Sequence, residues 1–358
     1  MLLPNKFLLT SLTVLALVAC NKKDDTPELS DTFASRKVIL SDISQHVIAA
    51  TYADMQTQAN TLNTEITELQ TSTTDANLTE CRNSWRNVRS AWEQSEGFLF
   101  GPVASENIDP RIDTWPVNHI DLDSILASSV EFTPQYIDEL QDALKGFHPV
   151  EYLLFGLNGD KTAAQFTDRE LSFLKALADN LQILCSQVSG RWNSSSSDSY
   201  LSKFVNAGSG SDEYPTQLAA FEEVVNAMIG ICEEVAGGKI SEPFAAQDPS
   251  LEESPYAQNS LKDFISNMKS VKNIYYGSYK TSGQGIKDYV RLYNLSLDAR
   301  IKQDIDQAIA ALEAISDPFG LAISTQGTLV QQAITRIETL KETLETQLLP
   351  LIQQHIKE

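Results

Sequence analysis

A histidine and a glutamate three residues apart give the sequence its clearest capacity for chemistry. His148 and Glu151 lie in residues 146–156 (GFHPVEYLLFG), whose apolar residues favour a short helix. Residues i and i+3 share one face of a helix, so the imidazole and the carboxylate can point at the same ion or substrate atom. Imidazole binds transition metals, and carboxylate binds both these and harder cations. Because the chain has only 4 histidines, little else in it could build a histidine site.

The same residues also allow a purely structural interpretation. Pro149 suits the first position of a helix, where its missing N–H costs nothing. His148 would then be the N-cap, and Glu151 would stand at N3, from which the glutamate of a capping box bonds back to the cap. The local sequence therefore leaves a helix cap and a pair of ligands as alternatives.

The segment resembles the Gly-x-His-x-x-Glu signature of the imelysin family, and further segments resemble the same family. They are residues 85–103 (WRNVRSAWEQSEGFLFGPV), residues 112–116 (IDTWP), and a weaker match made by residues 253–255 (ESP), 259–264 (NSLKDF) and 270–277 (SVKNIYYG). These matches span most of the chain beyond about residue 36. The resemblance implies two helical-bundle domains with a site at or near their junction.

The resemblance also implies a set of metal ligands. Residues 109–113 (DPRID) are similar to the Asp-Pro-x-Ile-Asp element of periplasmic iron-uptake lipoproteins related to imelysins. In those relatives the proposed ligands are an upstream Glu, the last Asp of this element, and the His and Glu of His-x-x-Glu. Carried over, they become Glu96, Asp113, His148 and Glu151. One imidazole with three carboxylates would suit iron, with zinc or calcium as alternatives.

Two of these ligands have structural alternatives as well. Glu96 continues the apolar face of the helix expected over residues 78–96, where a buried carboxylate needs a partner such as a metal or a histidine. If that helix frays at Gly97, Glu96 reaches water instead. Asp113 would equally serve as a turn or cap residue before the Trp115-Pro116 pair.

Three neighbouring residues are accessory candidates. Glu93 is expected to form an i,i+4 ion pair with Arg89 rather than to bind a metal. Trp115, like Trp92, could line a cleft, although core packing is the commoner fate of large aromatic residues. His119 follows Trp115 closely enough to reach the site.

The imelysin family takes its name from a reported peptidase activity, but this sequence favours binding. A metallopeptidase needs a metal with an open position and a carboxylate that is free to act as general base. Tyr152 stands where a second histidine would complete His-x-x-Glu-His, and the sequence has no His-Glu-x-x-His. We expect a metal-binding protein, with iron favoured and a role in uptake or iron regulation. A metal-dependent peptidase and a non-catalytic ligand-binding protein remain the alternatives.

The N-terminus is expected to carry a lipoprotein signal. Residues 1–19 have a basic start at Lys6 and a short apolar run, and Leu17-Val18-Ala19 before Cys20 resembles the bacterial lipobox. Lipidation of Cys20 would anchor the protein to the outer membrane, facing the periplasm or the cell surface. Residues 20–35 read as a tether. An iron-transport system is an expected partner.

Composition excludes one class of partner. The chain has 27 Lys plus Arg against 48 Asp plus Glu, a net charge of −21, whereas binding to nucleic acid is driven largely by basic side chains. Cys81, Cys185 and Cys232 lie in apolar helical patterns without a Cys-x-x-Cys motif, so buried free thiols are expected.

The periodicity of apolar residues predicts an all-α protein. Thr167 and Glu170 form a capping box, and an apolar stripe follows at spacings of three and four. The expected helices are about 36–70, 78–96, 167–192, 214–236, 259–276, 298–315 and 323–355, with loops at Ser194–Ser197, Gly208–Ser211 and Gly237-Gly238. We expect two bundles, 36–205 and 206–358, related by an internal duplication.

Overall fold

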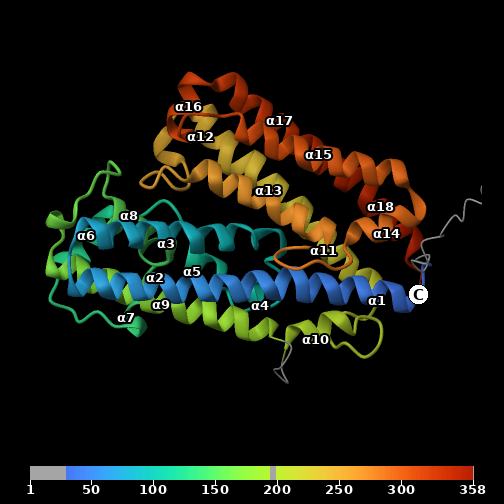
Figure 1. The fold of residues 1–358 in the computed structure, drawn as a ribbon, viewed down its shortest axis with the longest axis horizontal. Coiled ribbons are helices and arrows are strands. Elements are labelled where there is room, and N and C mark those ends of the chain that lie inside the picture. The colour runs from blue at the N-terminus through green and yellow to red at the C-terminus, as the bar shows by residue number, and fades with distance from the viewer. Residues whose placement is uncertain (1–29, 194–198, 358) are drawn as a thin grey trace, which may run out of the picture.

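The computed structural model describes residues 30–193 and 199–357, and these residues are almost entirely helical (Figure 1). Within the described ranges the only β-type pairing is an isolated bridge between Ser278 and Ser282, so the all-α prediction is confirmed. The predicted signal peptide, Cys20 and most of the predicted tether lie outside the described residues, as does the predicted loop at 194–197. Among the helices that are described, none has the length and apolar character needed to span a membrane.

The first half of the chain is built around three long helices, α2, α3 and α9, with shorter elements before, between and after them. In order, the elements are α1 (Phe33–Asp42), η1 (Ile43–Ala49), α2 (Ala50–Thr71), α3 (Asp75–Glu93), η2 (Glu96–Phe98), α4 (Pro102–Ser105), α5 (Asp109–Asp113), α6 (His119–Ala127), α7 (Pro134–Asp138), η3 (Asp142–Leu144), α8 (Phe147–Phe155), η4 (Ala163–Gln165), α9 (Asp168–Trp192) and α10 (Tyr200–Val205). Helix α2 packs on α3 and α9, and α8 packs on the same two helices.

The second half is a further group of packed helices. Its elements are α11 (Gln217–Glu233), η5 (Glu234–Ser241), α12 (Glu242–Ala246), η6 (Pro249–Leu251), α13 (Ser260–Tyr276), α14 (Ile286–Tyr293), α15 (Leu295–Glu313), α16 (Phe319–Thr325), α17 (Gly327–Thr343), η7 (Leu344–Leu348) and α18 (Leu349–His355). Helix α15 packs on α13 and α17, while α11 packs on α13, α17 and α18.

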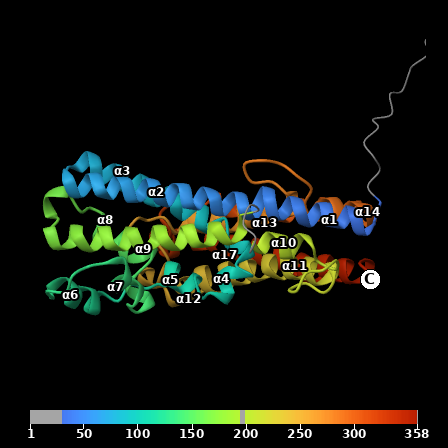
Figure 2. The ribbon, with the colours of Figure 1, turned by 90° about the horizontal axis from the view of Figure 1, so that it is seen from below.

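The two halves lie against each other along their length. In Figure 1 the orange-to-red helices α13, α15 and α17 occupy one side of the molecule, and the blue-to-green helices α2, α3 and α9 occupy the other. The contacts between them run through α3 and η2, which pack on α13, and through η2 on α11. Helix α1 packs on α10, α11 and α14, so the start of the described chain touches both halves (Figure 2). The predicted domain boundary and internal duplication stay predictions.

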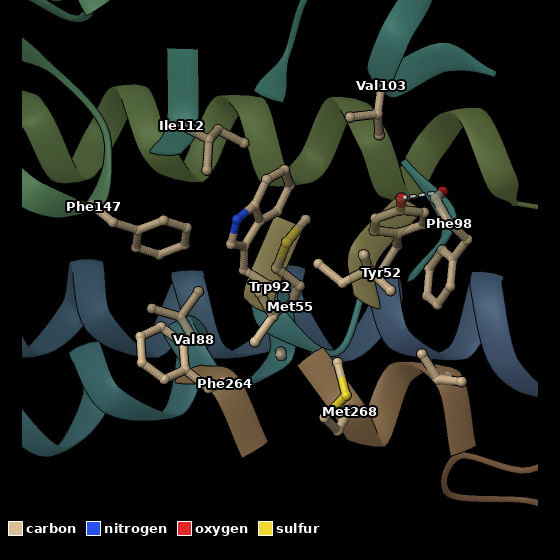
Figure 3. Close-up of a cluster of buried hydrophobic side chains, with 14 of the residues drawn as sticks. Tyr52, Met55, Val88, Trp92, Phe98, Val103, Ile112, Phe147, Phe264 and Met268 are labelled. Atoms are coloured by element: carbon tan, nitrogen blue, oxygen red, sulfur yellow. Dashed lines mark hydrogen bonds between the residues drawn. The ribbon is translucent and has the colours of Figure 1, made fainter. Parts of the chain in front are cut away.

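Buried apolar side chains from both halves form one contiguous core. Figure 3 shows Val88 and Trp92 of α3 beside Phe147 of α8, with Phe264 and Met268 of α13 completing the cluster. All five are fully buried. The two groups of helices are therefore joined by the same hydrophobic driving force that holds each of them together.

Local sequence signals explain several helix boundaries. The predicted capping box at α9 is present, because Thr167 Oγ1 accepts from the Glu170 N–H at 3.1 Å and Glu170 Oε2 accepts from the Thr167 N–H at 2.8 Å. Helix α1 begins at Phe33, three residues before the predicted start, since Thr32 caps it by accepting from the Ser35 N–H. Residues 33–35, the last part of the predicted tether, are therefore helical.

One predicted loop is wrong. Gly237 and Gly238 lie inside η5, a π-helical turn that continues α11 without a break. The pattern of two adjacent glycines suggested a chain break, but the helix continues through them with i→i+5 bonding. This turn carries Lys239 into the interior, where it is buried.

The three described cysteines fit the expectation from their patterns. Cys81, Cys185 and Cys232 are all buried free thiols. Burial raises the pKa of each thiol to about 12, so they are protonated at neutral pH and serve as small apolar side chains.

Candidate metal centre

His148 is positioned at the start of α8 by a close approach between the backbone at Gly146 and the backbone of Ile112 in α5. Helix α8 begins at Phe147, after Gly146 in the left-handed region with φ of 80°. A Cβ at residue 146 would lie 2.1 Å from the Ile112 carbonyl oxygen, so only glycine lets the chain pass α5 this closely. The glycine of the Gly-x-His-x-x-Glu motif thereby brings His148 beside Asp113, the last residue of α5.

The alternative of a helix cap made by His148 and Glu151 is wrong. Gly146 occupies the cap position, and no side chain caps the helix. Glu151 instead accepts from the Ala257 N–H with Oε1 at 2.7 Å, and its Oε2 lies 3.3 Å from Nδ1 of His148. This hydrogen bond satisfies the N–H of Ala257 in the second half of the chain, which would be costly to leave unpaired in the interior.

The imidazole of His148 lies between two carboxylates. Its Nε2 is 3.1 Å from Asp113 Oδ1, and its Nδ1 faces Glu151. Burial alone would lower the pKa of His148, but the hydrogen bonds to Asp113 and Glu151 outweigh it and raise the pKa to about 9. The ring is therefore a buried cation at neutral pH.

Arg89 lies at the centre of the surrounding charges. Its guanidinium contacts Glu93 at 2.5 Å, Glu253 at 2.7 Å, and Asp113. Asp263 of α13 lies 3.7 Å from its Nε. The predicted i,i+4 pair between Arg89 and Glu93 is thus present, and both side chains are fully buried. These partners come from α3, α5, the segment before α13, and α13 itself, so one side chain joins both halves of the molecule.

A second buried cation completes the arrangement. Lys239 of η5 places Nζ 2.8 Å from Glu96, 2.7 Å from Glu253 and 3.6 Å from Glu93. Asn267 of α13 donates to both Glu93 and Glu96 at 2.6 Å. Together with the residues around Arg89 these side chains form the buried charge cluster, namely Arg89, Glu93, Glu96, Asp113, His148, Glu151, Lys239, Glu253 and Asp263.

Glu96 is buried, as the first of its two expected environments requires, and it does not reach water. Helix α3 ends at Glu93, yet Glu96 stays buried because the chain continues as the single turn η2. Gly97 allows η2 to lie directly on α13, since a Cβ there would be 2.5 Å from Ser270 Oγ. The partners of Glu96 are Lys239 and Asn267.

Carboxyl groups outnumber cations in the cluster, and their pKa values reflect this. Burial raises the pKa of Glu93 to about 8 and of Asp263 to about 7, in each case against the attraction of Arg89. Burial, reinforced by Glu93, also raises the pKa of Glu96. Burial would also raise the pKa of Asp113, but Arg89 and His148 outweigh burial and hold this pKa well below its usual range. The cluster therefore retains bound protons at neutral pH.

Two overlapping sets of donor atoms could hold a metal ion. One is Asp113, His148 and Glu253, and the other is Glu93, Glu96, Asp113 and Glu253, with the donor atoms of each set within 4.8 Å of one another. Oε2 of Glu253 is buried and has no hydrogen-bond partner among the described residues. Glu253, His148 and Trp115 also help to line a cavity of about 10 Å³. An imidazole and two carboxylates, one of them with an unpartnered oxygen, fit a transition metal.

The structure brings the predicted ligands into one region but divides them between different partners. Asp113 and His148 meet directly, and Glu151 supports the far side of the ring. Glu96 belongs to the second donor set, which does not include His148.

The accessory candidates lie at the edge of the cluster. The Trp115 ring is half-buried with its centroid 6.1 Å from that of His148. His119 hydrogen-bonds Tyr256 at 2.6 Å and packs on Tyr152, outside the cluster. Trp92 is fully buried and donates to Asp113 at 2.6 Å, so it is a core residue and not a cleft aromatic.

Sequence reasoning missed Lys239, Glu253 and Asp263 as parts of the site. Glu253 and Asp263 fall within the weaker of the family matches, in residues 253–255 and 259–264, which was the signal available for them. Lys239 follows two glycines that read as a loop, so no local pattern marked it as buried.

The fold and the cluster define an all-α protein in which two groups of helices enclose a histidine among carboxylates. The family model for imelysin matches residues 48–346. This chain belongs to the imelysin family, as its motifs indicated.

Relatives agree with this membership. The chain is 33% identical over 312 residues to iron-regulated protein A of Synechococcus elongatus, covering 86% of this chain and 84% of that protein. A solved structure of an iron-regulated protein A precursor from Parabacteroides distasonis superposes with a TM-score of 0.81 at 24% identity, covering 92% of this chain and 96% of that one. An imelysin-like protein from Psychrobacter arcticum superposes with a TM-score of 0.74 at 12% identity, covering 91% and 98%. At these identities the two structures establish the shared fold.

Substituting Gly146 should disrupt the positioning of His148. Gly146→Ala combines a left-handed backbone with a collision against the Ile112 carbonyl, and we expect a loss of at least roughly 2 kcal/mol in the free energy of unfolding. Gly190→Ala in α9 is the matched control, because its new Cβ meets nothing within 4 Å, and it should be neutral or slightly stabilising. Urea unfolding followed by circular dichroism measures both, and equal stabilities would contradict this account.

The metal-free protein should lose stability as pH rises from about 6 to above 9. His148, Glu93 and Asp263 all have raised pKa values, so the folded state binds more protons than the unfolded state in this window. We expect the free energy of unfolding in urea to fall by more than about 1 kcal/mol between pH 6.5 and 9.5, since one pKa unit corresponds to about 1.4 kcal/mol.

General repulsion on an acidic surface would produce a similar trend, so the source needs a control. Glu93→Gln removes one raised group and should flatten the dependence on pH. Asp306→Asn, on an exposed partner of Lys272, changes the charge equally and should leave the slope as it is. An unchanged slope in Glu93→Gln would assign the trend to the surface.

Proposed function

We propose that this protein binds iron at the buried charge cluster and acts in iron uptake or in a response to iron supply. The observation that carries this proposal is the set of donor atoms from Asp113, His148 and Glu253, which lie within 4.8 Å of one another, together with the unpartnered Oε2 of Glu253. The name of the Synechococcus elongatus relative, iron-regulated protein A, supports iron over zinc or calcium as the ion. Mixed imidazole and carboxylate ligands suit iron chemically.

Binding of the ion would replace protons and rearrange ion pairs. His148 must give up a proton before a ring nitrogen can bind a metal, because its raised pKa keeps the ring protonated. Asp113 and Glu253 are both engaged by Arg89, so their oxygens would be shared between the guanidinium and the ion. In the metal-free cluster, bound protons compensate the excess of carboxylates. A bound metal ion would supply the positive charge in their place.

The geometry favours binding over peptide hydrolysis. His148 is 1% exposed, Glu151 is fully buried, and the cavity beside His148 has a volume of only about 10 Å³. A peptide bond needs more room than one water molecule occupies. Glu151 also engages Ala257 and His148, so it is not poised as a free general base.

The metal proposal is tested on residues 30–358 produced without an affinity metal. Anaerobic titration with Fe²⁺ and elemental analysis after desalting should give close to one ion per chain. His148→Ala and Glu253→Gln should each weaken binding by roughly tenfold or more, and Glu151→Gln, which acts through His148, should weaken it less.

His46→Ala is the matched control, because His46 is a partly exposed imidazole that contacts Thr281 and Asp42, both outside the cluster. It should bind iron like the unmodified protein. Circular dichroism confirms that each variant folds. Folded unmodified protein that retains no iron, or His148→Ala that retains as much as the control, would refute the site.

The N-terminal sequence supports a location for this function. We propose that Cys20 is acylated and anchors the protein in the outer membrane, where it would serve an iron-transport system. In the native host, Cys20→Ala should move the protein from the membrane fraction to the soluble envelope fraction, measured by immunoblotting. Retention of the variant in the membrane fraction would refute the lipid anchor.

A further inference from the structure

A second cavity lies beside the buried charge cluster, between α3 of the first half of the molecule and α13 of the second, and Asp263 belongs to both. Its volume is about 490 Å³, within the range of sites for small molecules. Asn83, Arg86 and Asn87 of α3 line one wall, and Lys262, Ser266 and Lys269 of α13 line the other. We refer to it as the α3–α13 cavity.

The α3–α13 cavity is basic in an otherwise acidic protein. The whole chain has 48 acidic residues against 27 basic ones, yet Arg86, Lys262 and Lys269 converge on this cavity. Of the two acidic residues in the lining, Asp263 is turned inward, where it accepts from Ser254 at 2.7 Å. Glu313, at the end of α15, is exposed.

The three cations form no ion pair with any described residue. Elsewhere on α13, Lys272 pairs with Asp306 at 2.8 Å. The side chain of Arg86 is half-buried and lies over the Phe155 ring, 4.8 Å from its centroid, and Glu151 acts on it only at longer range. A partly desolvated guanidinium without a carboxylate is unfavourable, and oxyanions are the ligands that its geometry matches best.

The cations stand on both walls of the cavity. Arg86 comes from α3, whereas Lys262 and Lys269 come from α13. A ligand that satisfies both walls carries two or more separated anionic groups. Inorganic phosphate has only one such group.

We propose that the α3–α13 cavity binds a small polycarboxylate, either free or as a ferric chelate. Arg86 would take one carboxylate in the two-pronged geometry of a guanidinium, and Lys262 and Lys269 would hold a second. The free form needs no metal bound to the protein; only the ferric form rests on the proposed function in iron handling.

Titration calorimetry with citrate on metal-free protein tests the site directly. Citrate should bind, and Arg86→Gln should weaken it by roughly tenfold or more, because hydrogen bonds to charged groups are among the stronger ones. Lys262→Gln and Lys269→Gln lie at exposed positions and give a second measure that does not depend on the half-buried arginine. Lys272→Gln, on the same helix but outside the lining, is the charge-matched control and should bind citrate normally.

Two further ligands test the chemistry of the occupant. Tricarballylate, which keeps the three carboxylates of citrate but lacks its hydroxyl, should bind about as well as citrate. Inorganic phosphate, which has a single anionic group, should bind more weakly. Absence of citrate binding, equal loss in Lys272→Gln, or phosphate binding as tightly as citrate would each overturn the assignment.

Two further titrations are needed. Ferric citrate shows whether the occupant is the free acid or its iron chelate. Free citrate titrated into His148→Ala shows whether the cavity binds independently of the metal site. Free citrate binding that survives in His148→Ala supports the cavity regardless of whether the buried cluster holds iron. Tighter binding of ferric citrate than of free citrate identifies the chelate as the occupant, and equal or weaker binding identifies the free acid. Absence of iron binding in the unmodified protein, with citrate binding intact, would count against the proposed function alone.

Discussion

The ion pairs of Arg89 are the interaction on which the rest of the structure depends. A guanidinium with no exposed surface is tolerated only when carboxylates surround it, and here they arrive from α3, α5, the segment before α13 and α13 itself. Each of these elements must therefore be in place before the charge is compensated. Trp92 and Phe147 pack around the same region, so apolar packing and charge pairing specify one arrangement of the helices.

Sequence patterns predicted the architecture and the centre of the site, because both depend on local spacing. The 3-4 repeat of apolar residues gave the long helices, and Gly146, His148 and Glu151 stood within one motif. The partners of these residues could not be predicted, since they depend on packing between distant segments. Lys239 is the clearest case. Its burial requires a π-helical turn through Gly237 and Gly238, and the i→i+5 bonding of such a turn leaves no periodic trace in the sequence.

Proton binding and the proposed metal binding share one cause in this cluster, which is an excess of enclosed carboxyl groups over cations. The metal-free protein responds by raising the pKa values of Glu93 and Asp263 and by keeping His148 charged. A bound cation would relieve the same imbalance. Glu253 links the two states, because one of its oxygens contacts both Arg89 and Lys239 while the other is unpartnered.

The joining of the two halves also limits how such a protein can be rearranged. Arg89 and His148 precede the Ser/Gly-rich region near residue 205, whereas Lys239, Glu253 and Asp263 follow it. A chain severed in that region would leave unbalanced charges on both fragments and would expose the apolar surface that they share. The halves look separable in outline, but they are not modules that could be exchanged or inherited independently. A substitution on one side must find its compensation on the other.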